Sequence, residues 1–167
     1  YKANTAKRGC IVKNKKRLVD VAAGRSEADL VLKNANVVNV FTQDILPGDI
    51  ALADGYIAGV GNYSAANEID GTDRYVCPGF IDAHIHIEST MVLPAEFVRM
   101  ALPSGTTTVI ADPHEIVNVC GARGMQFMLD ASENLPCNLS FMLPSSVPAT
   151  VFETAGGSFT ADDMRPF

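Results

Sequence analysis

The chain has 167 residues, of which 47% are hydrophobic and 19% are charged, and its formal net charge is −6. This composition predicts a globular protein with a core of its own and excludes an intrinsically disordered chain. The negative net charge offers no basic surface for a nucleic-acid backbone or an anionic membrane, so we expect neither partner. Because we find no apolar run long enough to span a bilayer and no secretory leader, we expect a cytoplasmic protein.

The first 28 residues are predicted to form an N-terminal arm and a helix that ends near "VAAGR". The basic stretch "KNKKRL" is interpreted as part of a solvated arm, because no aromatic side chains alternate with its charges as they would in a nucleic-acid patch. The four cysteines, Cys10, Cys77, Cys120 and Cys137, are far apart and form no Cys-x-x-Cys pair. We therefore expect reduced thiols and no disulfide framework.

Residues 29–77 are predicted to form a small antiparallel β subdomain. The segment "DLVLKNANVVNVF" is rich in β-branched residues and alternates in polarity, as half-buried strands do. Two Asp-Gly pairs, Asp54-Gly55 and Asp70-Gly71, each lie between apolar runs and indicate hairpin turns.

From Pro78 onwards strand and helix patterns alternate. We expect strands at "GFIDAHIHI", "TTTVIADP" and "CNLSFMLPSSVPA", helices at "LPAEFVRMALPSG" and "CGARGMQFMLDASEN", and a further helix beginning near Thr160. This alternation predicts an α/β fold with a parallel sheet or barrel. Residues 78–167 supply about three βα units, whereas a complete (β/α) barrel needs eight units and roughly 250 residues, so we expect the chain to be an incomplete fragment.

The sequence holds three histidines, and two of them, His84 and His86, lie one residue apart at the end of an apolar strand. Residues two apart in a strand face the same side, so both imidazoles can reach one metal ion. An isolated His-x-His pair is more often structural, but α/β barrels keep their active sites at the ends of their strands. We therefore predict that these two residues bind a metal.

A catalytic metal needs more than two protein ligands, and the second predicted strand ends in the string "IADPHEIVNV". In a parallel sheet this end lies at the same rim as His86, which makes Asp112, His114 and Glu115 candidates for metal binding, catalysis or support of the ligands. The alternative is structural: Asp-Pro starts a turn, and His-Glu begins a helix with favourable charge at its N-terminus.

Three further polar residues flank the histidine pair. Glu88 and Ser89 are candidates for contact with substrate, although capping of the next helix is the favoured interpretation. Asp82 lies two residues before His84 and could orient an imidazole by accepting its second N–H proton, or be a structural aspartate.

The string "PGFIDAHIHIEST" resembles the first-strand signature of the amidohydrolase superfamily, and "MVLPAEFVRMALPSGTTTVIADPHEIVNVCG" is similar to its adenine deaminase family. The resemblance implies a metal-dependent (β/α) barrel flanked by a small β-sandwich, and hydrolysis of adenine to hypoxanthine and ammonia in purine salvage. It also implies that His84 and His86 ligate one metal of a binuclear site that holds manganese or iron, with zinc as an alternative.

The remaining ligands implied by this resemblance lie on the fourth, fifth, sixth and eighth strands of the barrel, beyond Phe167. The isolated chain is therefore expected to be inactive, and most of the acid and base chemistry is expected beyond this chain. Two alternatives stay open: an amidohydrolase that acts on another nucleobase or a cyclic amide, and a barrel that serves as a silent scaffold. A homo-oligomer is compatible with each of these interpretations.

Overall fold

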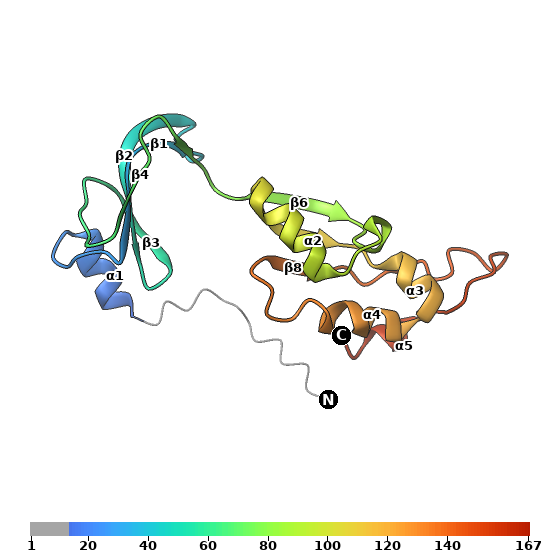
Figure 1. Ribbon diagram of the computed structural model, residues 1–167. Coiled ribbons are helices and arrows are strands. Elements are labelled where there is room, and N and C mark those ends of the chain that lie inside the picture. Colours follow the sequence, from blue (N-terminus) through green and yellow to red (C-terminus); the bar gives the residue numbers. More distant parts are fainter. Residues whose placement is uncertain (1–13) are drawn as a thin grey trace. The chain divides into compact units, whose positions relative to one another are not determined.

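The computed structural model describes residues 14–167, which divide into two compact units, with the division along the chain between Pro78 and Gly79 (Figure 1). The predictions for the solvated arm before residue 14 and for Cys10 lie outside the described residues. Within residues 14–167, no helix is both long and apolar enough to cross a membrane.

The first unit consists of one helix and one sheet. Helix α1 (Lys15–Ala22) begins where the side chain of Asn14 accepts a hydrogen bond from the Arg17 N–H, and it ends near "VAAGR" as predicted. The sheet has the order β3-β2-β1-β4, with β5 also paired to β1. Its strands are β1 (Leu30–Asn39), β2 (Asp44–Ala53), β3 (Tyr56–Gly61), β4 (Glu68–Asp70) and β5 (Tyr75–Val76).

The two Asp-Gly pairs of this sheet behave differently. Asp54 and Gly55 both have positive φ values, 52° and 79°, and join antiparallel strands β2 and β3 in the predicted hairpin. The prediction of a hairpin at Asp70-Gly71 was wrong, because β4 and β5 both pair parallel with β1. The Asp70 carboxylate accepts hydrogen bonds from the Thr72 N–H and hydroxyl, so the chain makes a local loop and continues along the same strand.

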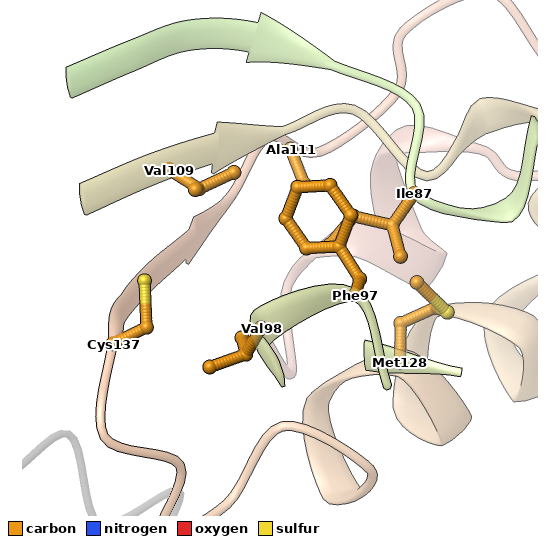
Figure 2. Packing of buried hydrophobic residues seen from close by; sticks show 7 residues of the cluster. All are labelled: Ile87, Phe97, Val98, Val109, Ala111, Met128 and Cys137. Atoms are coloured by element: carbon orange, nitrogen blue, oxygen red, sulfur yellow. The ribbon is translucent and has the colours of Figure 1, made fainter. Parts of the chain in front are cut away.

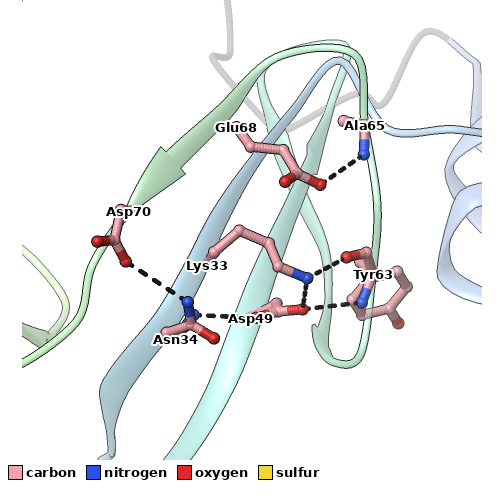
Figure 3. Close-up of polar contacts among 7 residues, drawn as sticks. All are labelled: Lys33, Asn34, Asp49, Tyr63, Ala65, Glu68 and Asp70. Carbon is pink, nitrogen blue, oxygen red and sulfur yellow. Dashed lines mark hydrogen bonds and ion pairs between the residues drawn. The ribbon is translucent and has the colours of Figure 1, made fainter.

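One carboxylate is buried in the first unit. Asp49 on β2 accepts hydrogen bonds from Lys33 Nζ at 2.6 Å, from the Asn34 N–H at 3.0 Å and from the Tyr63 N–H at 3.1 Å (Figure 3). These contacts join β1, β2 and the loop after β3. The apolar core of the unit lies nearby and consists of Val21, Ala28, Val31, Ala51 and Ala53. The second sheet of the expected β-sandwich is not found among residues 14–78.

The second unit alternates strands with helices around a parallel sheet of order β6-β7-β8. Its strands are β6 (Phe80–Ile85), β7 (Thr106–Ala111) and β8 (Asn138–Phe141). Its helices are η1 (Glu88–Thr90), α2 (Pro94–Ala101), η2 (Leu102–Ser104), α3 (His114–Cys120), α4 (Ala122–Asp130) and α5 (Ala161–Met164). The predicted α/β class with parallel strands is thus confirmed.

The boundaries of these elements follow local signals in part. Gly105 ends η2 with a φ of 97°, as expected of a helix stop, and Thr160 caps α5 through a capping box with Asp163. Helix α3 precedes α4 and begins at His114 with Glu115 in its first turn, as in the structural alternative for these two residues. One boundary differs from the prediction: β8 ends at Phe141, so the segment from Met142 to Ala149 is a loop.

The core of the second unit lies where α2 and α4 meet β7. Phe97 and Val98 from α2 and Met128 from α4 pack against Val109 and Ala111 of β7, as Figure 2 shows. Ile87, which follows His86 directly, is fully buried in the same cluster. The end of β6 is therefore anchored by an apolar side chain next to a histidine.

The pairing of β6 with β7 changes register twice. Asp82 pairs with Val109 but Ile85 pairs with Ala111, so β6 has one residue more than β7 over this stretch. Such a bulge redirects the side chains near it and is common beside active sites. Before the bulge the strands approach closely, because a Cβ on Gly79 would lie 2.1 Å from the hydroxyl oxygen of Thr107. Glycine is therefore required at position 79.

Candidate metal centre

The two histidines of the His-x-His pair converge. His84 is in β6 and His86 follows its last residue, and their Nε2 atoms are 3.3 Å apart. Two imidazole nitrogens that each lie about 2.1 Å from one ion at a near-tetrahedral angle are about 3.3–3.4 Å apart. The geometry therefore fits two ligands of a single metal ion.

The orientation of His86 is fixed by the backbone of the next strand. Its Nδ1 lies 2.8 Å from the carbonyl oxygen of Asp112, and because a carbonyl only accepts, Nδ1 carries the proton. Nε2 is thereby left with a free lone pair, which is the arrangement that metal-binding histidines need. The hydrogen bond to this carbonyl raises the pKa of His86. Burial acts in the opposite direction, and the negative charges of Glu115, Asp112 and Glu88 raise it further.

The three candidates after β7 lie around the same histidines. Asp112 follows β7, and His114 and Glu115 form the first turn of α3. The ring of His114 makes an edge contact with the ring of His86, at a centroid distance of 4.6 Å, and its Nδ1 lies 3.4 Å from Asp112 Oδ2. Two sets of three residues could each hold a metal ion, because the ligand atoms within each set lie within 4.8 Å of one another. The first set is His84, His86 and Asp112, and the second is His86, His114 and Glu115.

Three carboxylate oxygens in this cluster are buried and have no hydrogen-bond partner among residues 14–167: Glu88 Oε2, Asp112 Oδ1 and Glu115 Oε2. Buried polar atoms normally find a partner, and leaving a charged group unsatisfied is costly. A cation that binds beside His84 and His86 would satisfy such oxygens. The donor set of imidazole and carboxylate suits a divalent transition metal.

Glu88 and Ser89 make different contacts from those expected. The N-terminus of α2 has Leu93 at its cap position and no side-chain hydrogen bond, so neither residue caps that helix. Instead, Glu88 Oε1 accepts a hydrogen bond from the Ile116 N–H of α3 at 3.3 Å, and the Ser89 hydroxyl donates to Glu115 Oε1. The loop after β6 thus supports the first turn of the helix after β7.

Asp82 contacts the backbone of the first histidine. Its Oδ1 accepts a hydrogen bond from the backbone N–H of His84 at 3.1 Å, and the contact to a histidine ring is made by the Asp112 carbonyl. The contact with the His84 N–H is the one expected of a structural aspartate, and it lies where the register of β6 against β7 shifts. A role of Asp82 in orienting an imidazole stays a prediction.

Sequence reasoning missed a polar hollow of about 410 Å³ next to this cluster. Asp112 and His114 form one side of it, and the other lining residues are Asn118, Pro144, Ser145, Ser146, Ala149 and Glu153. The signal that could have found it is position, because the loop after β8 leaves the sheet at the same end as the loops after β6 and β7.

Comparison with known proteins identifies the family. The model of the amidohydrolase family matches residues 75–163, more than half of the chain and all three strands of the second unit. The chain belongs to the amidohydrolase family. The cluster around His84 and His86 lies at the carboxyl ends of the parallel strands β6 and β7, which is the end at which (β/α) barrels place their active sites.

Two adenine deaminases are similar to this chain over most of its length. An adenine deaminase from Ligilactobacillus salivarius is 57% identical over 150 residues, which are 89% of this chain and 26% of that protein. Adenine deaminase 2 from Desulfotalea psychrophila is 56% identical over 90% of this chain and 26% of its own length. The chain thus spans about a quarter of the length of these relatives.

Solved structures of more distant amidohydrolases share the fold. A D-hydantoinase from a Thermus species is 23% identical, with a TM-score of 0.52 over 72% of this chain and 29% of that chain. A D-aminoacylase is 21% identical, with a TM-score of 0.56 over 83% of this chain and 34% of its own. At these identities the likeness extends to the fold and not to the substrate.

Proposed function

We propose that the intact protein hydrolyses adenine to hypoxanthine and ammonia. The observation that carries this proposal is the identity of 56–57% with two adenine deaminases over about nine tenths of this chain, which includes the histidine cluster. The more distant hydantoinase and aminoacylase folds support the alternative of a cyclic-amide substrate less well, because they are at most 23% identical. A silent scaffold has no need of the converging His84 and His86.

We further propose that residues 78–167 form the first three βα units of a (β/α) barrel, and that residues 29–77 form the N-terminal part of a small β-sandwich. Three parallel strands in consecutive order, with helices between them, support the barrel. In this architecture His84 and His86 bind one ion of a binuclear manganese or iron centre. The remaining ligands then come from later strands.

The proposed reaction replaces the C6 amino group of adenine by the oxygen of water and releases ammonia. A bound divalent metal lowers the pKa of water and so supplies a hydroxide nucleophile near neutral pH. The residues of this chain hold and orient the reactants. His84 and His86, whose Nε2 atoms converge, would hold the metal. Glu115, held by the Ser89 hydroxyl, has one free carboxylate oxygen with which to accept or return a proton.

The test measures metal content and adenine-dependent ammonia release together, in the intact protein and in variants. We expect the wild type to carry metal and release ammonia, and His84→Ala and His86→Ala to lose metal and activity. Glu115→Gln should keep its metal but lose about 100-fold or more in kcat if the carboxylate carries a proton. The proposal would be contradicted if the metal-loaded wild type released no ammonia from adenine but did release product from a hydantoin or another base in a substrate panel.

A further inference from the structure

The polar hollow beside the histidine cluster has a wall that is already formed. Its inner side consists of Asp112 and His114, and its outer side is the loop after β8. The loop is closed by the Ala149 N–H, which donates to Glu153 Oε2 at 3.2 Å. Its far end returns to α3, where the Gly157 N–H donates to the Asn118 carbonyl at 2.9 Å. The hollow has a volume of about 410 Å³, within the range of roughly 300–1,000 Å³ that small-molecule sites occupy.

The return of the loop to α3 requires small residues. A Cβ on Gly157 would lie 2.5 Å from the Gly121 nitrogen, and a Cβ on Gly156 would lie 2.8 Å from the Val119 carbonyl oxygen. The backbone of this segment is therefore in direct contact with the end of α3. Asn118 and the loop are held at a fixed separation, which is the condition for a pre-organised pocket.

Several polar groups in the hollow are free to bind a ligand. Within residues 14–167, the Asn118 carboxamide and the hydroxyls of Ser145 and Ser146 have no hydrogen-bond partner, and Glu153 uses only one of its two oxygens. A carboxamide offers a donor and an acceptor side by side, and a carboxylate only accepts. Such a lining suits a ligand that combines ring nitrogens with a ring N–H group.

We infer that this hollow is the pocket that recognises the purine base, and that Asn118 and Glu153 hydrogen-bond to ring nitrogens on the edge remote from the reacting carbon. The inference rests on the proposed function. C6 must face the metal held by His84 and His86, while the opposite edge of the purine passes Asp112 and His114 and enters the hollow. A free base has an N–H in the five-membered ring, which Glu153 can accept. A nucleoside has a sugar at that nitrogen, so Glu153 also favours the free base over the nucleoside.

The inference is tested with Asn118→Ala and Glu153→Gln in the intact, metal-loaded protein. Glu153→Gln keeps an oxygen for the Ala149 N–H, so the loop stays closed while the charge is lost. We expect KM for adenine and Kd for hypoxanthine to rise about 10- to 100-fold in each variant. Metal content should be unchanged and kcat should stay within about threefold. Glu153→Gln should also reduce the preference for adenine over adenosine.

Matched controls are Asn138→Ala, at the opposite end of β8, and the exposed Glu133→Gln, both of which should behave like the wild type. Asn118→Asp is nearly isosteric and removes the amide donor, so the test does not depend on how the alanine variant folds. Unchanged KM and Kd in Asn118→Asp and Glu153→Gln would overturn the inference. Direct binding of hypoxanthine separates the purine pocket from the proposed deaminase function. If the wild type binds hypoxanthine but releases no ammonia from adenine, only the deaminase function is contradicted.

Discussion

The two ring nitrogens of His86 face different partners: Nδ1 lies 2.8 Å from the Asp112 carbonyl oxygen, and Nε2 lies 3.3 Å from Nε2 of His84. The spacing of two between His84 and His86 was enough to predict that both imidazoles lie on the same side of the strand. The group that holds the second nitrogen could not be predicted, because it is the backbone carbonyl of Asp112 and every residue has a carbonyl. The polar hollow was missed for a similar reason: its loop takes its shape from contacts with Gly121 and Asn118 that no local pattern encodes.

At the residue scale, Asp49 predicts how the first unit responds to acid. Burial alone would raise the pKa of its carboxyl, but hydrogen bonds from Lys33 and from the N–H groups of Asn34 and Tyr63 lower it below the ordinary 3.8. A lowered pKa stabilises the fold above about pH 4 and loses this contribution as the pH falls through the folded-state pKa. We expect Asp49→Asn to cost about 2 kcal/mol at pH 7, because the ion pair with Lys33 is lost.

The same variant supplies the pH test. Hydrogen exchange of the β1 and β2 amides in the intact protein measures the stability of the unit. The difference between wild type and Asp49→Asn should shrink as the pH falls from 5 towards 2. Asp44→Asn, at the exposed start of β2, is the control and should have little effect at either pH. A difference that is the same at both ends of this range would show that the charge of Asp49 does not stabilise the unit.

At the scale of elements, periodicity predicted the strands and helices that pack on one face, and failed where pairing is decided by distant residues. Helix α2 and strand β7 were predicted close to their observed bounds, because apolar spacing and the stop at Gly105 are local signals. β4 and β5 were predicted to form a hairpin, yet both lie parallel to β1. Their direction depends on backbone bonds such as the one from the Gly71 N–H to the Lys33 carbonyl, which a turn motif does not reveal.

The docking of α2 on β7 yields a second prediction. The ring of Phe97 lies against Ala111 and next to Ile87 (Figure 2), and only 8% of the residue is exposed. Phe97→Ala should destabilise the second unit by about 3–4 kcal/mol, since it leaves a cavity that the neighbouring strand cannot fill. Urea titration of the intact protein measures this change. Phe97→Leu retains most of the volume and should cost clearly less, and equal losses for the two variants would contradict a packing role.

At the scale of the whole molecule, the candidate metal ligands found among residues 14–167 all lie in the second unit. His84, His86, Asp112, His114 and Glu115 come from the ends of two neighbouring parallel strands and from the helix and loops that follow them. The sequence located this rim because parallel strands end on one side of a sheet. The first unit supplies a sheet and a helix to the chain but none of these ligands.

Because these candidate ligands lie in the second unit, we expect removal of the metal by a chelator to destabilise that unit. An ion that binds only the folded state stabilises it, by about 2.7 kcal/mol at a free concentration of 100 times Kd. Removing the metal should therefore increase hydrogen exchange in β6 and β7, while the amides of β1 and β2 keep their protection. Addition of Mn²⁺ should restore the original pattern. Equal loss of protection in both units would indicate that the ion stabilises more than the second unit.

The extra residue of β6 between Asp82 and Ile85 has a consequence for sequence variation. The bulge sets the position of His84, whose N–H is held by Asp82, while Ile87 anchors the chain immediately after His86. Substitutions at Ala83 leave this spacing intact. Deletion of one residue there would shift the register of His84 and His86, so that His86 no longer lies opposite the Asp112 carbonyl. We therefore expect an alignment of relatives to contain fewer insertions and deletions than substitutions between Asp82 and Ile87, because the number of residues between these two anchors sets where His84 and His86 lie.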